Sequence, residues 1–180
     1  MGKRRAPWSP PACTNRLAVH MCDSGLTWTV KTSFVRYIES MKDGHVAVAG
    51  GALRLEDGSF HFPLASGTPR NGLAFGGSVH FTGHFGMLSL AISAPAVVST
   101  DDGLVLSIAD DEPGERRPFV ILGKPGQYPG HVEFPSPALT PAGAELFFDN
   151  YRPGTLFDPI FVMPGLPRQA DSKHQEVWHD

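Results

Sequence analysis

The chain has 180 residues, with 15 Lys and Arg against 18 Asp and Glu, and a formal net charge of −3. Hydrophobic residues make up 41% of it and charged residues only 18%, which excludes a wholly disordered chain and fits one globular domain. Apart from the terminal run 3–5 the basic residues are scattered, so no nucleic-acid surface is expected.

The first 24 residues are rich in proline and have no hydrophobic period, so they predict a disordered tail. Both cysteines, Cys13 and Cys22, lie in this tail and cannot cross-link the core. With His20 they form a possible metal-ligand set, but free side chains are the favoured interpretation.

The beginning of the chain also bears on its location. The basic run 3–5 continues into the proline-rich residues 6–11, which are not the apolar segment of a secretory signal. No apolar stretch is long enough to span a membrane. The expected location is therefore the cytoplasm.

The first predicted element is a helix over residues 29–41. Thr29 is expected to cap its start, and Gly44 to end it with a left-handed backbone. The apolar residues that follow the helical period are Val30, Phe34, Tyr37, Ile38 and Met41.

From residue 45 onwards, short apolar runs alternate with turns that contain glycine, proline and polar residues. Within one of these runs, Gly76 and Gly77 indicate a bulge or a close approach of two backbone segments. The runs predicted as strands are 45–48, 53–55, 60–64, 73–81, 87–92, 96–98, 104–108, 118–122, 131–134 and 159–162.

A short second helix is predicted over residues 140–147, with Thr140 as its cap and Pro141 at its first position. The whole pattern predicts a mainly β domain over residues 25–164, an antiparallel β-sandwich or flattened barrel with one N-terminal helix and one short second helix. Residues 165–180 are expected to form a polar C-terminal tail.

Two distant segments carry the residues with the most distinctive chemistry. Ser33 and Tyr37 lie four positions apart on the first helix and share one face, with Phe34 beside them. Far along the chain, His84 and Phe85 stand in a turn between two glycines. A phenol, an imidazole and an apolar wall would suit ferric haem, because tyrosine is a known axial ligand of haem iron. Spacing alone does not bring these residues together, and each is also common without any ligand.

The sequence resembles the HtaA family, haem-binding domains of actinobacterial haem uptake. The most specific part is the segment 75–88, which contains Ser78-Val79-His80-Phe81-Thr82-Gly83-His84-Phe85. The other matching segments follow in the family's order and are 26–38, 60–68, 139–144 and 151–159.

The resemblance implies a β-sandwich-like fold that holds ferric haem b against the first helix. It implies that Tyr37 is the axial iron ligand, that His84 hydrogen-bonds to this tyrosine, and that Ser33 lines the site. We add Phe34, His80 and Phe85 as candidate haem contacts. Phe85 stands where family members often carry a small polar or acidic residue, so the edge of the site should be more apolar here.

The expected function is that of a haem-binding carrier, buffer or uptake component. Its expected partners are haem and another haem-carrier protein. Family members are usually secreted or on the cell surface, in contrast to the location expected above. No enzyme is expected, because the sequence contains no nucleophile–base motif and no metal-ligand spacing such as His-Glu-x-x-His. The alternative is a cofactor-free β-sandwich that binds a protein or a glycan.

Overall fold

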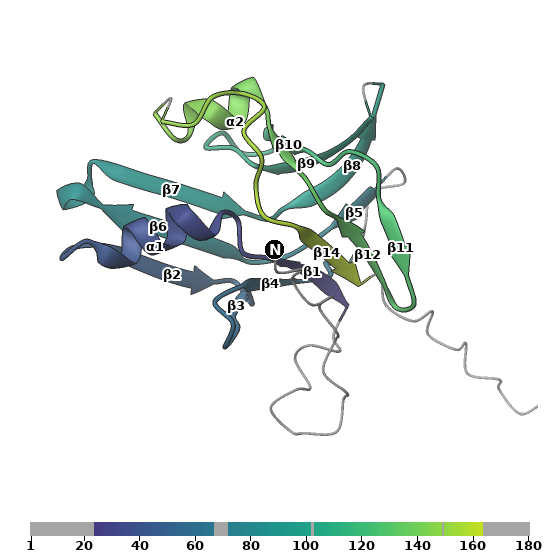
Figure 1. Cartoon of the computed structure of the whole chain (residues 1–180), viewed down its shortest axis with the longest axis horizontal. Helices are drawn as coiled ribbons and strands as arrows, with labels where there is room; N and C mark the ends of the chain where they lie inside the picture. Colours follow the sequence, from purple (N-terminus) through teal and green to yellow (C-terminus); the bar gives the residue numbers. More distant parts are fainter. Residues whose placement is uncertain (1–23, 67–71, 102, 149, 164–180) are drawn as a thin grey trace, which may run out of the picture.

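The computed structural model describes residues 24–66, 72–101, 103–148 and 150–163. These residues form short antiparallel strands, two α-helices and a 3-10 turn (Figure 1). The helical elements are α1 (Thr32–Ser40), η2 (His84–Gly86) and α2 (Pro141–Glu145). The strands are β1 (Gly25–Trp28), β2 (His45–Ala49), β3 (Leu53–Arg54), β4 (Phe60–Pro63), β5 (Gly72–Ala74), β6 (Ser78–Gly83), β7 (Leu88–Ser93), β8 (Ala96–Thr100), β9 (Gly103–Ala109), β10 (Arg116–Ile121), β11 (Gly126–Tyr128), β12 (His131–Phe134), β13 (Ala138–Leu139) and β14 (Ile160–Met163).

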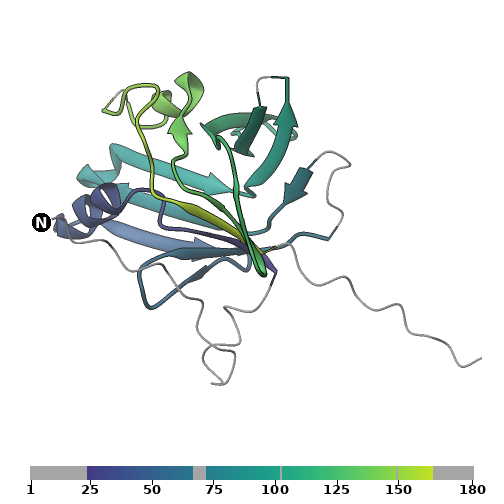
Figure 2. The ribbon, with the colours of Figure 1, turned by 45° about the vertical axis from the view of Figure 1, so that its right-hand side comes forward.

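The strands make three antiparallel sheets. Their orders are β11-β12-β14-β1-β4-β3, β13-β10-β9-β8-β5 and β2-β6-β7. Turned by 45°, the molecule shows the sheets at angles to one another around a common interior (Figure 2). The predicted mainly β fold with two helices is confirmed, and within the described residues the sheets do not close into a barrel.

Helix α1 lies across β2 and β6 of the three-stranded sheet (Figure 1). Its apolar side, Phe34, Val35 and Ile38, is buried, whereas Arg36 and Tyr37 are exposed. This amphipathic pattern explains why the helix forms there, because a short helix depends on packing for its stability. The predicted helix is confirmed, with narrower limits than expected.

Both predicted end signals of α1 were wrong. Thr29 is not the cap, because Val30 turns the chain with a φ of 68° and the helix begins only at Thr32. The backbone N–H of Thr32 instead donates to the carboxylate of Asp158 at 2.7 Å. Gly44 does not have a left-handed φ, but a Cβ there would lie 1.7 Å from the carbonyl oxygen of Ile38. Close packing therefore requires this glycine.

Helix α2 begins as predicted. The Thr140 side chain accepts a hydrogen bond from the N–H of Gly143 at 2.8 Å, and Pro141 occupies the first helical position. The Thr140 hydroxyl also donates to the carbonyl of Pro118 in β10 at 2.6 Å. These contacts fix α2 against the five-stranded sheet.

The predicted run 73–81 is two strands in two different sheets. Between β5 and β6, Gly77 has a φ of 87°, and a Cβ on it would lie 2.5 Å from the backbone nitrogen of Ala52. The predicted close approach of backbones is confirmed. The sequence analysis missed β1, β11 and β13, of which β1 is fully buried between β14 and β4.

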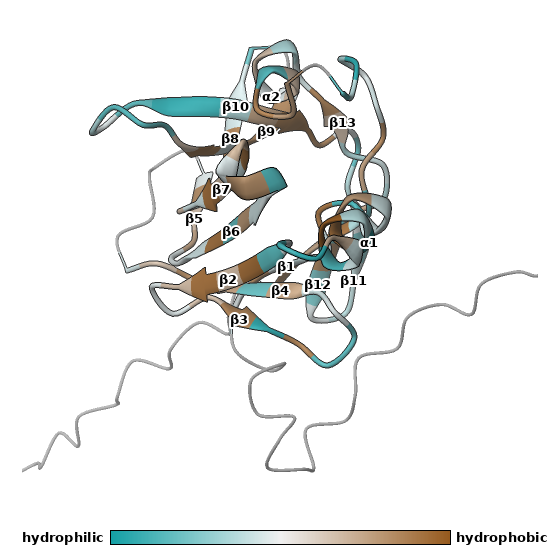
Figure 3. Ribbon diagram, turned by 90° about the vertical axis from the view of Figure 1, so that its left-hand side faces the viewer, coloured by the Kyte–Doolittle hydropathy of each residue, from teal (hydrophilic) through white to brown (hydrophobic). Residues whose placement is uncertain are grey.

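The core is rich in aromatic residues, and its largest fully buried side chains include Trp28, Phe60, Phe62 and Phe119. Strand β9 is largely hydrophobic, whereas part of β10 is hydrophilic (Figure 3). The predicted tails and both cysteines lie outside the described residues, except for Ser24, whose carbonyl accepts a hydrogen bond from Leu64 at 2.9 Å.

Candidate functional site

A cavity of about 530 Å³ lies between α1, the η2–β7 segment and the chain that follows α2. Cofactor and small-molecule sites typically have volumes of roughly 300–1,000 Å³ and mostly apolar walls. Among the described residues, no Asp, Glu, Lys or Arg lines the cavity; the lining residues are Phe34, Tyr37, His84, Met87, Leu88, Leu90, Leu146, Phe147, Phe148, Asn150 and Tyr151. The cavity therefore suits a largely apolar ligand.

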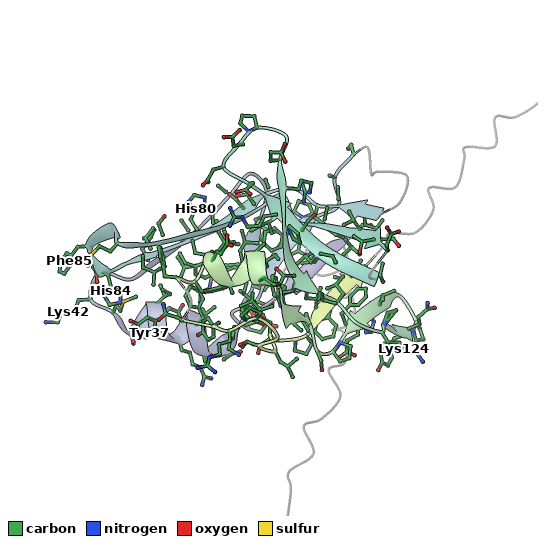
Figure 4. The ribbon with its side chains drawn as sticks, turned by 90° about the horizontal axis from the view of Figure 1, so that it is seen from above. Tyr37, Lys42, His80, His84, Phe85 and Lys124 are labelled. Atoms are coloured by element: carbon green, nitrogen blue, oxygen red, sulfur yellow. The ribbon has the colours of Figure 1, made fainter. Side chains whose placement is uncertain are left out.

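Tyr37 and His84 face each other at this cavity (Figure 4). The Tyr37 hydroxyl and His84 Nε2 are 2.7 Å apart, and the two ring centroids are 6.0 Å apart. Tyr37 is 48% exposed and lines the cavity, so its side chain is accessible to a ligand as well as to the imidazole. The two residues are 47 positions apart in sequence, and their expected proximity is confirmed. Their roles toward a ligand remain predictions.

The position of His84 is set by the β2–β6 ladder and the turn that follows it. Thr82 pairs with His45, so β6 ends close to the C-terminal end of α1. The chain then reverses through three residues with positive φ, namely 52° at His84, 55° at Phe85 and 85° at Gly86. A left-handed backbone costs a non-glycine residue about 1–2 kcal/mol. Such strain next to a cavity is typical of a functional site.

The inner wall of the cavity is a cluster of aromatic rings. The Phe34 ring packs edge-on against Phe81 and against Phe147, with centroids 5.2 Å apart in both pairs. Tyr151 packs perpendicular to Phe147 at 5.1 Å. Lys31 lies over the Tyr151 ring, with its Nζ 5.6 Å from the centroid. These contacts join α1, β6 and the chain after α2 into one wall.

An ion-pair network supports this wall from the outer side of α2. The Arg117 guanidinium lies 3.1 Å from Asp110 and 3.1 Å from Glu145. The hydrogen bond from Arg117 lowers the pKa of Asp110, and the same bond raises the pKa of Arg117. Burial lowers the pKa of the neighbouring Arg116. None of these groups lines the cavity, so their role is to hold β9, β10 and α2 together.

Phe34 lines the cavity as expected, but three other candidate residues do not. Ser33 is exposed one helical turn before Tyr37. His80 is exposed on β6 between the buried Val79 and Phe81, so it points to the opposite face of the sheet (Figure 4). Its expected contact with haem stays a prediction.

Phe85 also lies outside the cavity, and its expected contact with haem stays a prediction. It is 94% exposed at the tip of the turn, beyond His84 (Figure 4). It is not among the residues that line the cavity, although its neighbour His84 is.

The sequence analysis missed most of the wall residues after η2 and after α2. The run Leu146-Phe147-Phe148 carried a usable signal, because three large apolar residues at the end of a surface helix need a partner. In the structure Phe147 is buried, Phe148 is 63% exposed, and all three residues line the cavity.

The fold and the site define a small, mainly β domain with an apolar cavity that carries a Tyr–His pair. The HtaA family model matches residues 23–163, and the chain belongs to this family. Comparison with curated protein sequences found no match. No helix within the described ranges is long and apolar enough to cross a membrane.

Three solved structures from Corynebacterium glutamicum share the fold. The N-terminal domain of HtaA is 23% identical with a TM-score of 0.58, and the match covers 80% of this chain and 98% of that one. The heme binding protein HtaB is 19% identical with a TM-score of 0.58, over 77% of this chain and 90% of that one. The C-terminal domain of HtaA is 24% identical with a TM-score of 0.54, and the match covers 77% of this chain and 93% of that one.

Proposed function

We propose that this protein binds ferric haem b with the Tyr37 phenolate as axial ligand, and that it serves as a haem carrier, buffer or uptake component. The observation that carries the proposal is the Tyr37 oxygen at an apolar cavity, 2.7 Å from His84 Nε2. The similarity in fold to HtaB, described as a heme binding protein, supports it.

The residues of the cavity fit haem in three respects. The aromatic and aliphatic lining suits the flat, apolar faces of a porphyrin. Tyr37, Met87 and Phe148 are 48%, 76% and 63% exposed, so the mouth is open and would leave the carboxylate edge of a porphyrin in water. Tyr37 offers a hard anionic oxygen to ferric iron.

His84 controls the proton on the Tyr37 oxygen. A phenolate oxygen only accepts hydrogen bonds, so His84 Nε2 must carry a hydrogen when Tyr37 is ionised. When the neutral imidazole carries its hydrogen on Nδ1, Nε2 can take the proton that leaves the Tyr37 oxygen across the 2.7 Å contact, and the ring becomes an imidazolium. The Nε2–H then donates back to the phenolate and fixes the direction of its lone pairs. Haem supplies a ferric centre that accepts this oxygen.

This arrangement also gives a means of release. Phenolate favours the ferric over the ferrous state, so reduction should weaken binding. Protons compete with iron for the same oxygen, so acid should weaken it too. Titrations with haem in dithionite and at low pH measure both effects, and an affinity that is unchanged under both conditions would contradict this release mechanism.

A haemin titration followed by absorbance tests the function. The wild type should give a Soret band of the tyrosinate type, and Tyr37→Phe should lose most of the affinity because only the oxygen is removed. His84→Ala should weaken binding about 10- to 100-fold, as the loss of a residue that orients a metal ligand typically does. Tyr128→Phe is the matched control, because Tyr128 is 51% exposed and lies on β11.

The results of this titration separate the alternatives. Equal spectra and affinities for the wild type and Tyr37→Phe would refute the ligand assignment. No spectral change with the wild type would favour a cofactor-free interaction module. We further propose that binding occurs without catalysis, so the porphyrin should stay intact when the complex is incubated with a reductant, and its degradation would show an enzyme.

A further inference from the structure

The carboxylate of Asp43 links the two halves of the Tyr–His pair. It accepts a hydrogen bond from the backbone N–H of Phe85, the residue directly after His84. Asp43 lies in the connection between α1 and β2, six residues after Tyr37. One side chain thus joins the end of the helix that carries Tyr37 to the turn that carries His84.

The β2–β6 register explains why Asp43 reaches this turn. His45 pairs with Thr82, so the same antiparallel register extended by two residues places Asp43 opposite His84. Gly83 packs against this connection, where a Cβ on it would lie 3.9 Å from the Gly44 Cα and would displace only the flexible end of the Met41 side chain. The pairing of β2 with β6 therefore places the Asp43 carboxylate beside the turn.

The turn connects β6 to β7, whose paired residues Gly83 and Leu88 close it. His84 and Phe85 have φ values of 52° and 55°, in the left-handed region that residues other than glycine rarely adopt. The Phe85 side chain is 94% exposed and adds almost no packing. Two further hydrogen bonds involve the turn: the Met87 N–H donates to the His84 carbonyl at 3.1 Å, and the His84 ring contacts the Tyr37 hydroxyl. The Asp43 carboxylate is thus a direct support of the left-handed backbone at Phe85.

We propose that Asp43 is a positioning residue for the candidate haem site. By holding the N–H of Phe85 it keeps the turn left-handed, and this conformation directs His84 Nε2 at the Tyr37 oxygen. Asp43 acts through the backbone and does not contact the ligand. The consequence for haem rests on the function proposed above, whereas the consequence for the Tyr–His contact does not.

The test begins with the unliganded full chain in solution. NMR measures the nuclear Overhauser effect between the Tyr37 and His84 rings and the hydrogen exchange of the Phe85 amide. In Asp43→Ala, the ring contact should be lost and the amide should exchange about three- to tenfold faster, as expected for the loss of one hydrogen bond. Asp43→Asn keeps a carbonyl oxygen acceptor and should retain most of both signals.

Haemin titration of the same variants gives the second readout. The affinity of Asp43→Ala should fall about three- to tenfold, and Asp43→Asn should restore most of it. Asp57→Ala is the matched control, because the Asp57 carboxylate accepts a hydrogen bond from the Ser59 N–H at 2.9 Å in another exposed turn. This control should change neither the ring contact nor the affinity.

Each outcome decides a separate point. An unchanged ring contact in Asp43→Ala would overturn the proposal, whatever the haemin affinity. A lost contact with unchanged affinity would overturn the role of Asp43 in binding. If the contact is lost in Asp43→Ala but no variant, including the wild type, binds haemin, the positioning role stands and the proposed function fails.

Discussion

Replacing Phe34 by alanine removes the ring that joins α1 to β6 and to the chain after α2. The ring is 4% exposed and makes two edge-on aromatic contacts at 5.2 Å. Truncating a buried phenylalanine typically costs about 3–5 kcal/mol, including the void that is left. Because the void would join the existing cavity and admit water, we expect the lower end, about 3 kcal/mol.

Urea unfolding measures this loss in the free energy of unfolding, and Phe34→Leu and Phe85→Ala are the control variants. Phe34→Leu keeps most of the volume and should cost less than about 1.5 kcal/mol. Phe85→Ala removes an equally large ring that is 94% exposed, so its free energy of unfolding should stay within about 0.5 kcal/mol of the wild type. A loss below about 1 kcal/mol for Phe34→Ala, or an equal loss at Phe85, would refute the packing argument.

Three further predictions concern the frame around the cavity. Gly77→Ala should cost about 2–3 kcal/mol, since its φ is 87° and the new Cβ would lie 2.5 Å from a backbone nitrogen. Gly58→Ala, with a φ of 84° and open space, should cost only about 1 kcal/mol, and equal thermal shifts at both sites would contradict the clash. Thr140→Ala should cost about 1 kcal/mol in urea unfolding through loss of the α2 cap, and Thr140→Ser should restore most of it. Arg117 lowers the pKa of Asp110 in the folded protein. The pair therefore stabilises the fold at pH values above the ordinary aspartate pKa of about 3.9. This stabilisation is lost as the pH falls through the lowered pKa of the folded state. The difference in Tm between wild type and Asp110→Asn should therefore be constant from neutral pH to about pH 5 and close below about pH 4, and a difference that persists at lower pH would refute the assignment.

The two helices show which structural signals are local in sequence. At α2 the cap Thr140 and the following Pro141 are adjacent, so both the helix and its first residue could be predicted. At α1 the first free N–H binds the carboxylate of Asp158, which is 126 positions away. Periodicity therefore identified this helix, but its first residue depends on a contact that only the folded chain makes.

Some strands could likewise be predicted from a local sequence pattern, whereas others could not. Runs with alternating or β-branched residues, such as β9, were found because that pattern suits a sheet. Strand β1 was missed although Leu26, Thr27 and Trp28 alternate, because it has only four residues and the helical pattern of α1 begins almost directly after it. The run 73–81 was not divided, because the path of the chain from one sheet to another at Gly77 depends on how closely Ala52 approaches.

The candidate site depended on the family resemblance more than on spacing. Tyr37 and His84 are too far apart in sequence for a local pattern to pair them, and the resemblance supplied the pairing. The position of His80, in contrast, was available from the sequence, because the apolar Val79 and Phe81 on either side of it already indicate the opposite face of a strand.

Resonance Raman spectroscopy of the ferric haem complex tests the central claim most directly, because it detects the vibrations of an iron-bound phenolate. These bands should be present in the wild type and in the Tyr128→Phe control, and absent in Tyr37→Phe. Phenolate bands that persist in Tyr37→Phe, or a wild-type complex that lacks them, would contradict the assignment of Tyr37 as the iron ligand.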